Sequence, residues 1–248
     1  MIDTLIIVPT YNNAGTLENV LQRCLKQGLP VLVVDDGSTD GTAGILDGMR
    51  DLEGVMADSD RPSLSIVRHP ENKGKGCALK TGFEEARKQG YKYALTIDSD
   101  GQHFPEDIPA LLDAKGERTL VVGSRSQMGA DGGGSFANRF SNFWFRLYTG
   151  VNLPDTQTGF RLYPLMELPS LTLLSARYEA ELTLLVFSAW KGLELKPVPV
   201  HVDYPEDRVS HFRPGADFMR ISLLNTLLLL VAIFYGWPRT LLRRLAGK

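Results

Sequence analysis

Cysteine is scarce in this chain, which has only Cys24 and Cys77 among its 248 residues. The two are not spaced as Cys-x-x-Cys, so we expect neither a disulfide framework nor a thiolate metal site, and a reducing compartment is favoured. The N-terminus also lacks the basic and apolar regions of a secretory signal peptide, because residues 1–10 have the pattern of a β-strand. The sequence therefore predicts a cytoplasmic protein.

An excess of charge of one sign is absent as well. Lys and Arg number 27 against 29 Asp and Glu, which gives a formal net charge of −2. Nucleic acid is not an expected partner, because its phosphates bind proteins through a basic field. Hydrophobic residues make up 43 % of the chain and charged residues 23 %, which is typical of a globular protein and excludes a disordered or multi-span membrane chain.

Two common signatures of nucleotide-binding proteins are missing. The chain contains neither a Walker loop nor a Gly-x-Gly-x-x-Gly motif, and Asn72-Lys73-Gly74-Lys75-Gly76 has the spacing of neither. A P-loop NTPase and a dinucleotide-dependent dehydrogenase are therefore disfavoured. Any phosphate site in this chain has to be built from other residues.

Apolar runs alternate with polar turns and amphipathic segments along the first half of the chain. Strands are expected at 4–10, 31–34, 64–67, 93–97 and 120–123, with helices between them. This alternation is typical of an α/β protein with a Rossmann-like, mainly parallel central sheet flanked by helices. Further along we expect a mobile loop at 129–134, helices at 136–148 and 177–191, and an extended segment at 193–202, whose Pro-Val-Pro-Val run disfavours a central strand.

The C-terminal part differs from the main domain, which we place at residues 1–215. Residues 221–237 contain no charge and are followed by Pro238 and a basic tail. A helix of that length is about 26 Å long, slightly less than the roughly 30 Å hydrocarbon core of a bilayer. We therefore expect 216–248 to be a membrane-associating helical segment in the interface, with Trp237 among the headgroups and the basic tail on anionic lipid. A single membrane span and a buried core or dimer helix are the alternatives.

The strongest functional signal is Asp98-Ser99-Asp100-Gly101-Gln102, which directly follows an apolar strand. In an extended backbone alternate side chains lie on one side, so Asp98, Asp100 and Gln102 would offer oxygen ligands to one point. Such ligands suit Mg²⁺ or Mn²⁺, which bind one or two carboxylates together with substrate phosphates. The pattern predicts a metal site that holds a diphosphate. The alternative is an ordinary acidic turn.

A second polar cluster follows the first two strands. Asp35 and Asp36 end one strand, and Pro9 and Tyr11 lie at the end of the other. Sheets of this kind bind ligands at the carboxyl edge of their strands, where carboxylates accept hydrogen bonds from a base or a ribose and an aromatic ring stacks on the base. The alternative for the two aspartates is a turn followed by a helix cap.

Together these motifs resemble those of the inverting glycosyltransferases of family 2, most closely the dolichyl-phosphate mannose synthase type and its bacterial polyprenyl-phosphate relatives. The matching segments are Val8–Asn12, Val33–Thr42, Asn72–Gly76, Asp98–His103, Gly123–Arg125 and Asp155–Arg161. The resemblance implies a glycosyltransferase A-type fold. One position departs from the family pattern, because Asn13 stands where the family usually has Glu.

The resemblance also implies roles for individual residues. We expect a nucleotide-sugar site at Pro9, Tyr11, Asp35, Asp36, Lys75 and Asp98, a metal site at Asp98, Asp100 and Gln102, catalytic roles for Asp98, Asp100, Arg125 and Asp155, and an acceptor-phosphate site at Arg125, Arg139 and Arg213. The expected cofactor is Mg²⁺ or Mn²⁺. The expected reaction moves a hexose, mannose or glucose, from a nucleoside-diphosphate sugar to a polyprenyl phosphate at the cytoplasmic face of a membrane.

The acceptor decides which groups the chemistry needs. A phosphate monoester is mostly dianionic at neutral pH, so it needs cationic partners such as arginine rather than a strong base. A hydroxyl acceptor, the first alternative, would need a carboxylate base, for which Asp155 or one of Glu179 and Glu181 is the candidate. The second alternative is a sugar-nucleotide-binding subunit without catalytic activity.

Overall fold

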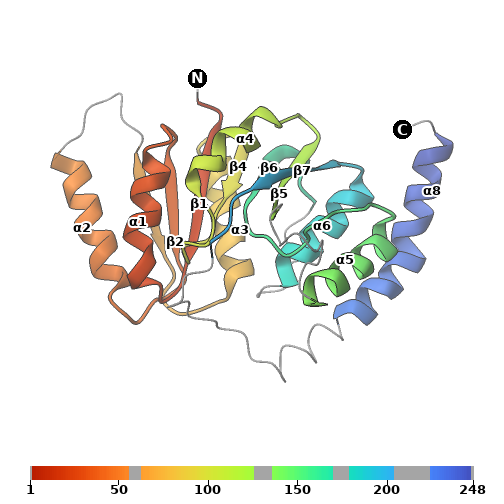
Figure 1. Ribbon diagram of the computed structural model, residues 1–248, viewed down its shortest axis with the longest axis horizontal. Coiled ribbons are helices and arrows are strands. Elements are labelled where there is room, and N and C mark those ends of the chain that lie inside the picture. Colours follow the sequence, from red (N-terminus) through yellow and green to blue (C-terminus); the bar gives the residue numbers. More distant parts are fainter. Residues whose placement is uncertain (1, 56–62, 126–135, 170–178, 204–223, 247–248) are drawn as a thin grey trace.

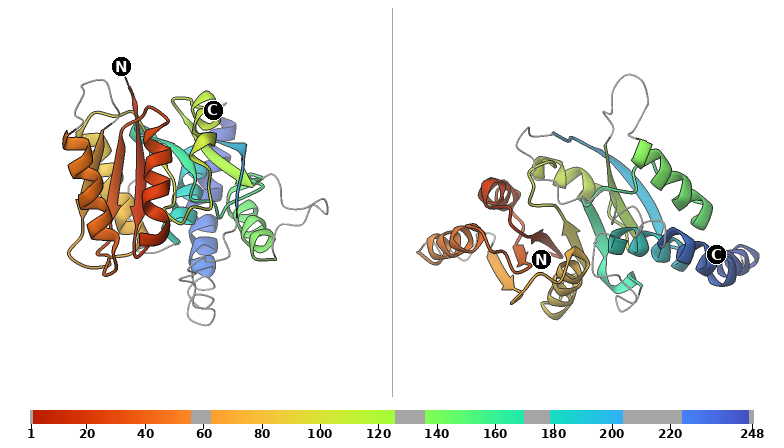
Figure 2. Two further views of the ribbon diagram at one scale, coloured as in Figure 1. Left: turned by 60° about the vertical axis from the view of Figure 1, so that its left-hand side comes forward. Right: turned by 90° about the horizontal axis from the view of Figure 1, so that it is seen from below.

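The computed structural model describes residues 2–55, 63–125, 136–169, 179–203 and 224–246. The loop expected at 129–134 lies outside these residues. In the described part, strands form one seven-stranded sheet in the order β3-β2-β1-β4-β6-β5-β7. Helices lie on both sides of this sheet (Figure 1 and Figure 2). The expected α/β architecture is therefore confirmed.

The strands differ from expectation mainly at their ends. The five expected strands are β1 (Thr4–Thr10), β2 (Val31–Asp35), β3 (Leu64–Arg68), β4 (Tyr93–Thr96) and β5 (Thr119–Arg125). The proline-containing segment forms β7 (Glu194–Val200), which is the edge strand beside β5. This position suits the prolines, because proline has no N–H to donate to a neighbouring strand. A central strand pairs with neighbours on both sides, whereas an edge strand pairs on one side only.

One strand, β6 (Arg161–Pro164), was not predicted. It lies between β4 and β5 and is antiparallel to both, so the sheet is mixed although its other pairs are parallel. It has only four residues and starts with a buried arginine, so neither length nor alternation marks it as a strand.

Two helical layers enclose the sheet because side chains along each strand alternate between its faces. In β1, Ile6 and Val8 pack with α1 (Ala14–Leu25), α2 (Thr42–Val55) and α4 (Ile108–Asp113). Leu5 and Ile7 belong to the opposite core, which is covered by α3 (Lys75–Lys88), α5 (Phe136–Thr149) and α6 (Glu179–Lys191).

The C-terminal helix continues past its expected end at Trp237. It runs from 224 to 245 and contains a π-helical turn, η4 (Ala232–Gly236), followed by α8 (Trp237–Leu245). Pro238 in this helix has no N–H, and its ring crowds the carbonyl group four residues earlier. The wider π-helical turn just before it relieves this conflict, and the helix continues.

This C-terminal helix is packed against α5 and α6 on one side only. Leu228 and Ala232 are buried in the core that contains Trp190 of α6. The hydroxyl group of Tyr148 in α5 donates a hydrogen bond to Asn225 Oδ1 at 3.0 Å. By length and composition alone, Leu224–Arg243 could cross a membrane. Instead of projecting freely, however, the segment shares a core with the main domain.

Candidate active site

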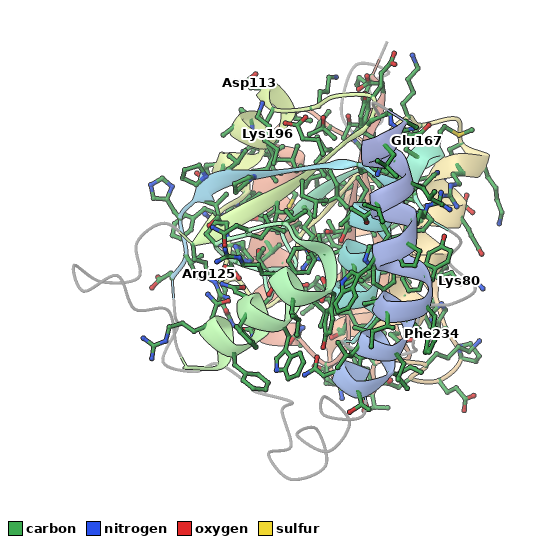
Figure 3. The ribbon with its side chains drawn as sticks, turned by 90° about the vertical axis from the view of Figure 1, so that its right-hand side faces the viewer. Lys80, Asp113, Arg125, Glu167, Lys196 and Phe234 are labelled. Carbon is green, nitrogen blue, oxygen red and sulfur yellow. The ribbon has the colours of Figure 1, made fainter. Side chains whose placement is uncertain are left out.

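The candidate site lies at the edge of the sheet where β1, β2, β4 and β5 end. These strands run in one direction, since β1 is parallel to β2 and β4, and the antiparallel β6 connects β4 to β5. The first residue of β6, Arg161, pairs with Thr96 near the end of β4. The loops after these strands and the segment before β6 therefore converge, and Arg125 marks the place in Figure 3.

The loops after β1 and β2 are joined by hydrogen bonds from Asn12, which has a left-handed backbone with φ +53°. Its N–H donates to Ser38 Oγ at 3.0 Å, and its Oδ1 accepts the N–H of Thr39 at 2.8 Å. Tyr11 is half-buried beside this junction, and Pro9 is buried within β1. The two predicted nucleoside contacts therefore stand on a braced part of the edge.

The predicted acidic pair after β2 is buried and used internally. Both oxygens of Asp36 accept hydrogen bonds, Oδ1 from His69 Nδ1 at 2.6 Å and from the N–H of Lys73 at 3.0 Å, and Oδ2 from the N–H of Gly74 at 2.7 Å. Asp35 Oδ1 accepts the N–H of Ser38 at 3.0 Å. In this structure Asp36 therefore holds the turn that begins α3, and Asp35 holds the loop after β2, in addition to any role toward a nucleoside.

The acidic motif after β4 has a different backbone from the one that we expected. β4 ends at Thr96, and the following residues form a turn in which Gly101 has φ +76°. Asp100 Oδ1 accepts the N–H of Gln102 at 3.0 Å within this turn. The argument from an extended backbone that placed Asp98, Asp100 and Gln102 on one side was wrong, because the backbone turns at residues 99–101. The motif itself is nevertheless at the predicted edge.

Two polar residues hold this turn against β1 and α1. Asn13, the residue that departs from the family pattern, donates from Nδ2 to Ser99 Oγ at 2.8 Å. The hydroxyl group of Thr16 donates to the Ser99 carbonyl oxygen at 2.6 Å. The start of α1 thus fixes the position of the metal-binding candidate.

Lys75, at the first position of α3, lies between two carboxylates. Its Nζ is 2.7 Å from Asp98 Oδ1 and 2.9 Å from Glu181 Oε2, and Glu181 comes from the first turn of α6. Gly159 leaves room for this group, because a Cβ atom there would lie 2.6 Å from Asp98 Oδ2 and 2.9 Å from Lys75 Nζ. The three charged side chains come from distant parts of the sequence, so their meeting depends on the tertiary fold.

The ionisation of this cluster follows from its contacts. Burial alone would raise the pKa of Asp98, but the nearby Lys75 ammonium outweighs burial and lowers it. Burial would likewise lower the pKa of Lys75, but Asp98 and Glu181 together raise it. Asp98 is therefore a carboxylate and Lys75 a cation across the physiological pH range.

His103 follows the acidic turn and is 6 % exposed. Its Nε2 lies 3.4 Å from Thr158 Oγ1. Burial lowers the pKa of this imidazole, so it is neutral at pH 7. A neutral imidazole next to Asp98 adds no positive charge to the site.

The residues of the turn fit a divalent cation that shares its ligands with a substrate. Among the described residues, no group of three or more His, Cys, Asp or Glu side chains is close enough to hold a metal ion. Asp98 and Asp100 supply two carboxylates, the number that Mg²⁺ and Mn²⁺ use when phosphate oxygens complete the shell. The donor set therefore suits a metal that arrives with a diphosphate rather than a permanently held structural ion.

Arg125 and Asp155, both predicted to be catalytic, form an ion pair with each other. Arg125 Nε is 2.5 Å from Asp155 Oδ2, and its Nη2 is 2.8 Å from Oδ1. The side chains are 17 % and 2 % exposed. Both carboxylate oxygens of Asp155 are therefore engaged by the guanidinium group, which is the geometry of a bidentate pair. Asp155 also accepts the N–H of Gln157 at 3.0 Å, so it holds the following turn as well as Arg125.

The other predicted acceptor residues are not part of this pair. Arg139 is exposed on α5, and Arg213 lies outside the described residues. Sequence reasoning missed Glu181 as a partner of Lys75 and treated it only as a candidate base. The one available signal was its place near the start of a helix, which does not identify a partner in α3.

Comparison with known proteins identifies the family of this fold. The model of the family described as glycosyl transferase family 2 matches residues 5–164. Polyprenol monophosphomannose synthase of Mycolicibacterium smegmatis is 34 % identical over 173 residues, which cover 64 % of this chain and 61 % of that protein. Undecaprenyl-phosphate mannosyltransferase of Micrococcus luteus is 35 % identical, over 64 % of this chain and 65 % of the relative. The matched region thus spans slightly less than two thirds of these two relatives.

A third relative is covered more fully. UDP-N-acetylglucosamine–dolichyl-phosphate N-acetylglucosaminyltransferase of Methanococcus voltae is 30 % identical over 83 % of this chain and 88 % of its own length. Among solved structures, glucosyl-3-phosphoglycerate synthase of Mycobacterium tuberculosis in complex with Mn²⁺, UDP and phosphoglyceric acid has a TM-score of 0.64 and 22 % identity, over 92 % of this chain and 78 % of that one. This likeness supports the fold. The family model covers more than half of the sequence, and the chain belongs to glycosyl transferase family 2.

Proposed function

We propose that this protein transfers a hexose, mannose or glucose, from a nucleoside-diphosphate sugar to a polyprenyl phosphate, with inversion at the anomeric carbon. The observation that carries the proposal is the acidic Asp98–Asp100 turn at the carboxyl edge of the sheet, where Lys75 contacts Asp98 and Arg125 ends β5. The names of the relatives above support the acceptor class, because three of them describe transfer to a polyprenol or dolichol phosphate.

The donor end of the reaction uses the acidic turn. Asp98 and Asp100, with Gln102, would hold Mg²⁺ or Mn²⁺ together with the donor diphosphate. When bound, such a cation neutralises the negative charge that develops on the leaving diphosphate. Tyr11, half-buried at the end of β1, would stack on the nucleoside base, and the brace made by Asn12 would keep it in place.

The acceptor end of the reaction needs cations rather than a base. A phosphate monoester at neutral pH is already a nucleophile, and a guanidinium group binds it through two oxygens. Arg125 would supply this contact, with Arg139 and Arg213 as further candidates. Asp155 is held by Arg125 through both oxygens, and Glu181 is bound to Lys75. These contacts argue against either carboxylate as the base for a hydroxyl acceptor.

An exposed apolar surface suits an acceptor that is embedded in a membrane. We define the apolar ridge as the exposed side chains of α5 and the C-terminal helix. Its large hydrophobic members are Phe140, Phe143, Leu147, Leu227, Leu230, Ile233, Phe234, Tyr235, Trp237, Leu241, Leu242 and Leu245. The two helices are neighbours, since Trp237 Nε1 donates to the Leu147 carbonyl oxygen at 3.3 Å, and Figure 3 shows Phe234 on the outer helix.

The ridge would lie on the lipid surface of the cytoplasmic face, with residues 216–248 as the main membrane-associating segment. Two arginines of the expected basic tail are held by the protein, because Arg239 and Arg243 donate to the carbonyl oxygens of Trp190 and Gly192 at 3.2 and 3.4 Å. We therefore expect apolar contact to contribute more to membrane binding than these two charges do.

Transfer is tested with purified protein, undecaprenyl phosphate in vesicles, and a panel of GDP- and UDP-sugars with Mn²⁺ or Mg²⁺. We expect one donor to give an organic-soluble sugar phospholipid, whose anomeric configuration by NMR is opposite to that of the donor. Asp100→Asn should abolish the product, and Glu84→Gln on the exposed face of α3 should not change it. Absence of product with every donor would refute the proposal. Nucleotide binding without turnover would instead indicate the non-catalytic alternative.

Membrane binding is tested separately by flotation with anionic vesicles. The double variant Phe143→Ser and Phe234→Ser should bind less, because these side chains are 61 % and 79 % exposed on the ridge. Met166→Ser is the matched control, since Met166 is 78 % exposed but lies outside the ridge. Equal flotation of all three proteins would contradict the lipid-facing role of the ridge.

A further inference from the structure

The ion cluster around Lys75 contains one positive group and two negative groups. Lys75 Nζ is shared between Asp98 at 2.7 Å and Glu181 at 2.9 Å. The side chains of Lys75, Asp98 and Glu181 are 16 %, 26 % and 9 % exposed. Of the two carboxylates, Asp98 is more exposed and belongs to the acidic turn, whereas Glu181 lies deeper. The ammonium group thus links a substrate-facing carboxylate to a buried one.

Glu181 offers a second place for this ammonium group. Among the residues that the structure describes, its other oxygen, Oε1, is buried without a hydrogen-bond partner. A buried carboxylate oxygen without a partner is costly, so a donor that reaches it gains stability. Lys75 has three donor hydrogens and uses two acceptors here. The backbone of Glu181 is fixed independently, since Arg161 Nη1 donates to its carbonyl oxygen at 2.9 Å.

Gly159 packs closely against both partners of the ion pair, Lys75 and Asp98. A Cβ atom at Gly159 would lie 2.9 Å from Lys75 Nζ and within the same distance of both Asp98 oxygens. Only glycine leaves the end of the lysine side chain uncrowded at this point. Because Lys75 Nζ already contacts both Asp98 and Glu181, a change of partner requires only a small displacement of the ammonium group.

We infer that Lys75 competes with the divalent cation for Asp98, and that Glu181 receives the lysine when the cation binds. Without donor, the ammonium group neutralises Asp98. When a cation binds in the acidic turn, it repels the ammonium group and takes a lone pair of Asp98 that the lysine had used. The ammonium group is therefore displaced toward Glu181, where it still faces the donor phosphates. The inference rests on the proposed function for the assignment of Asp98 to a metal. It makes Lys75 and Glu181 positioning residues for the donor complex.

Binding of Mn²⁺ without nucleotide, measured by electron paramagnetic resonance of the free ion, tests this inference. Lys75→Met should bind Mn²⁺ about tenfold more tightly, because one charge-assisted contact no longer has to be broken. Glu181→Gln should bind about tenfold more weakly, because the lysine loses its alternative partner. Lys80→Met on the same helix is the matched control, since Lys80 pairs only loosely with Glu84, at 3.9 Å, and should change affinity less than about twofold.

A nucleotide arm separates competition from a general charge effect. With UDP or GDP present, Lys75→Met should bind the nucleotide more weakly than the wild type, because the displaced lysine faces the phosphates. Lys75→Arg keeps the charge and should return Mn²⁺ affinity toward the wild-type value. Thermal unfolding shows whether each variant is folded, and Lys75→Arg remains informative if Lys75→Met is not.

Several results would overturn the inference. Unchanged or weaker Mn²⁺ binding by Lys75→Met, or tighter binding by Glu181→Gln, contradicts competition. Equal Mn²⁺ binding by the wild type and Asp98→Asn refutes the cation site itself, and the inference with it. If the predicted changes in Mn²⁺ affinity occur but no sugar is transferred, the inference stands and the proposed function fails.

Discussion

The ion pair between Arg125 and Asp155 permits a quantitative test of the candidate site. Asp155→Asn keeps the shape of the side chain and one oxygen for the N–H of Gln157, but it removes the negative charge that faces the guanidinium group. Removal of one partner from a fully buried ion pair costs about 3–5 kcal/mol. Because Arg125 is 17 % exposed and gains some hydration, we expect a loss of about 2–4 kcal/mol in the free energy of unfolding.

Urea unfolding followed by tryptophan fluorescence measures this loss. A double-mutant cycle with Arg125→Met isolates the pair, and we expect a coupling energy of about 2 kcal/mol. Asp47→Asn is the control, because Arg68 and Asp47 also form a two-contact pair, through both terminal nitrogens at 3.0 and 3.3 Å, on the exposed side of α2. That variant should lose much less stability. A coupling energy below about 0.5 kcal/mol would refute the reasoning, because the pair would then contribute no more than a surface contact.

The same variant distinguishes a structural role of Asp155 from a catalytic one. If Asp155 orients Arg125 for the acceptor phosphate, Asp155→Asn should raise the KM for polyprenyl phosphate more than it lowers kcat. If Asp155 were a general base, kcat would fall and KM would stay near its original value. A pure loss of kcat in a fully folded variant would therefore favour the hydroxyl-acceptor alternative.

Three further outcomes follow from single contacts. Burial lowers the pKa of His103 from 6.5, so its contribution to stability is complete above pH 6.5 and is lost as the pH falls toward the pKa of the folded state. The variant His103→Gln should therefore show a smaller decrease in the free energy of unfolding between pH 7 and pH 5 than the wild type does. Gly159→Ala should lower the rate of sugar transfer strongly and the melting temperature only slightly, because the new Cβ would press on the flexible end of Asp98. Measurement of kcat together with thermal unfolding checks this. Gly236→Ala should lower the melting temperature and alter tryptophan fluorescence, because the new Cβ would lie 2.3 Å from the Trp190 ring.

The parts of the fold that were predictable carry their signal within a short stretch of sequence. β1 and β2 are apolar runs that are buried along their whole length, and polar turns follow both. β6 has no such signal, because it is held in place by its two neighbours rather than by its own pattern. The C-terminal helix was expected to end at Trp237, before Pro238, but the π-helical turn that precedes the proline allows the helix to continue, and no local pattern marks that turn.

The candidate site was predictable to the level of the sheet edge but not to the level of contacts. Because parallel strands end at one edge, the acidic motifs after β2 and β4 could be placed at the same edge of the sheet. The partners of these residues are set by the docking of other elements. Lys75 meets Glu181 only because α3 and α6 cover the same face of the sheet. Arg125 meets Asp155 because the segment before β6 returns beside β5.

These pairings determine how charge is distributed before any substrate binds. Among the described residues at the site, the cations are Lys75, Arg125 and Arg161, and the carboxylates are Asp98, Asp100, Asp155 and Glu181. Within this described set carboxylates outnumber cations, so these residues present no net positive charge to a bare diphosphate, which should bind weakly. A divalent cation reverses this balance. We therefore expect nucleotide binding to depend steeply on Mn²⁺ or Mg²⁺, and calorimetric titration with and without metal should show it. Equal nucleotide affinity in the presence of a chelator would mean that the cations of the protein bind the phosphates on their own, and the assigned role of the acidic turn would be wrong.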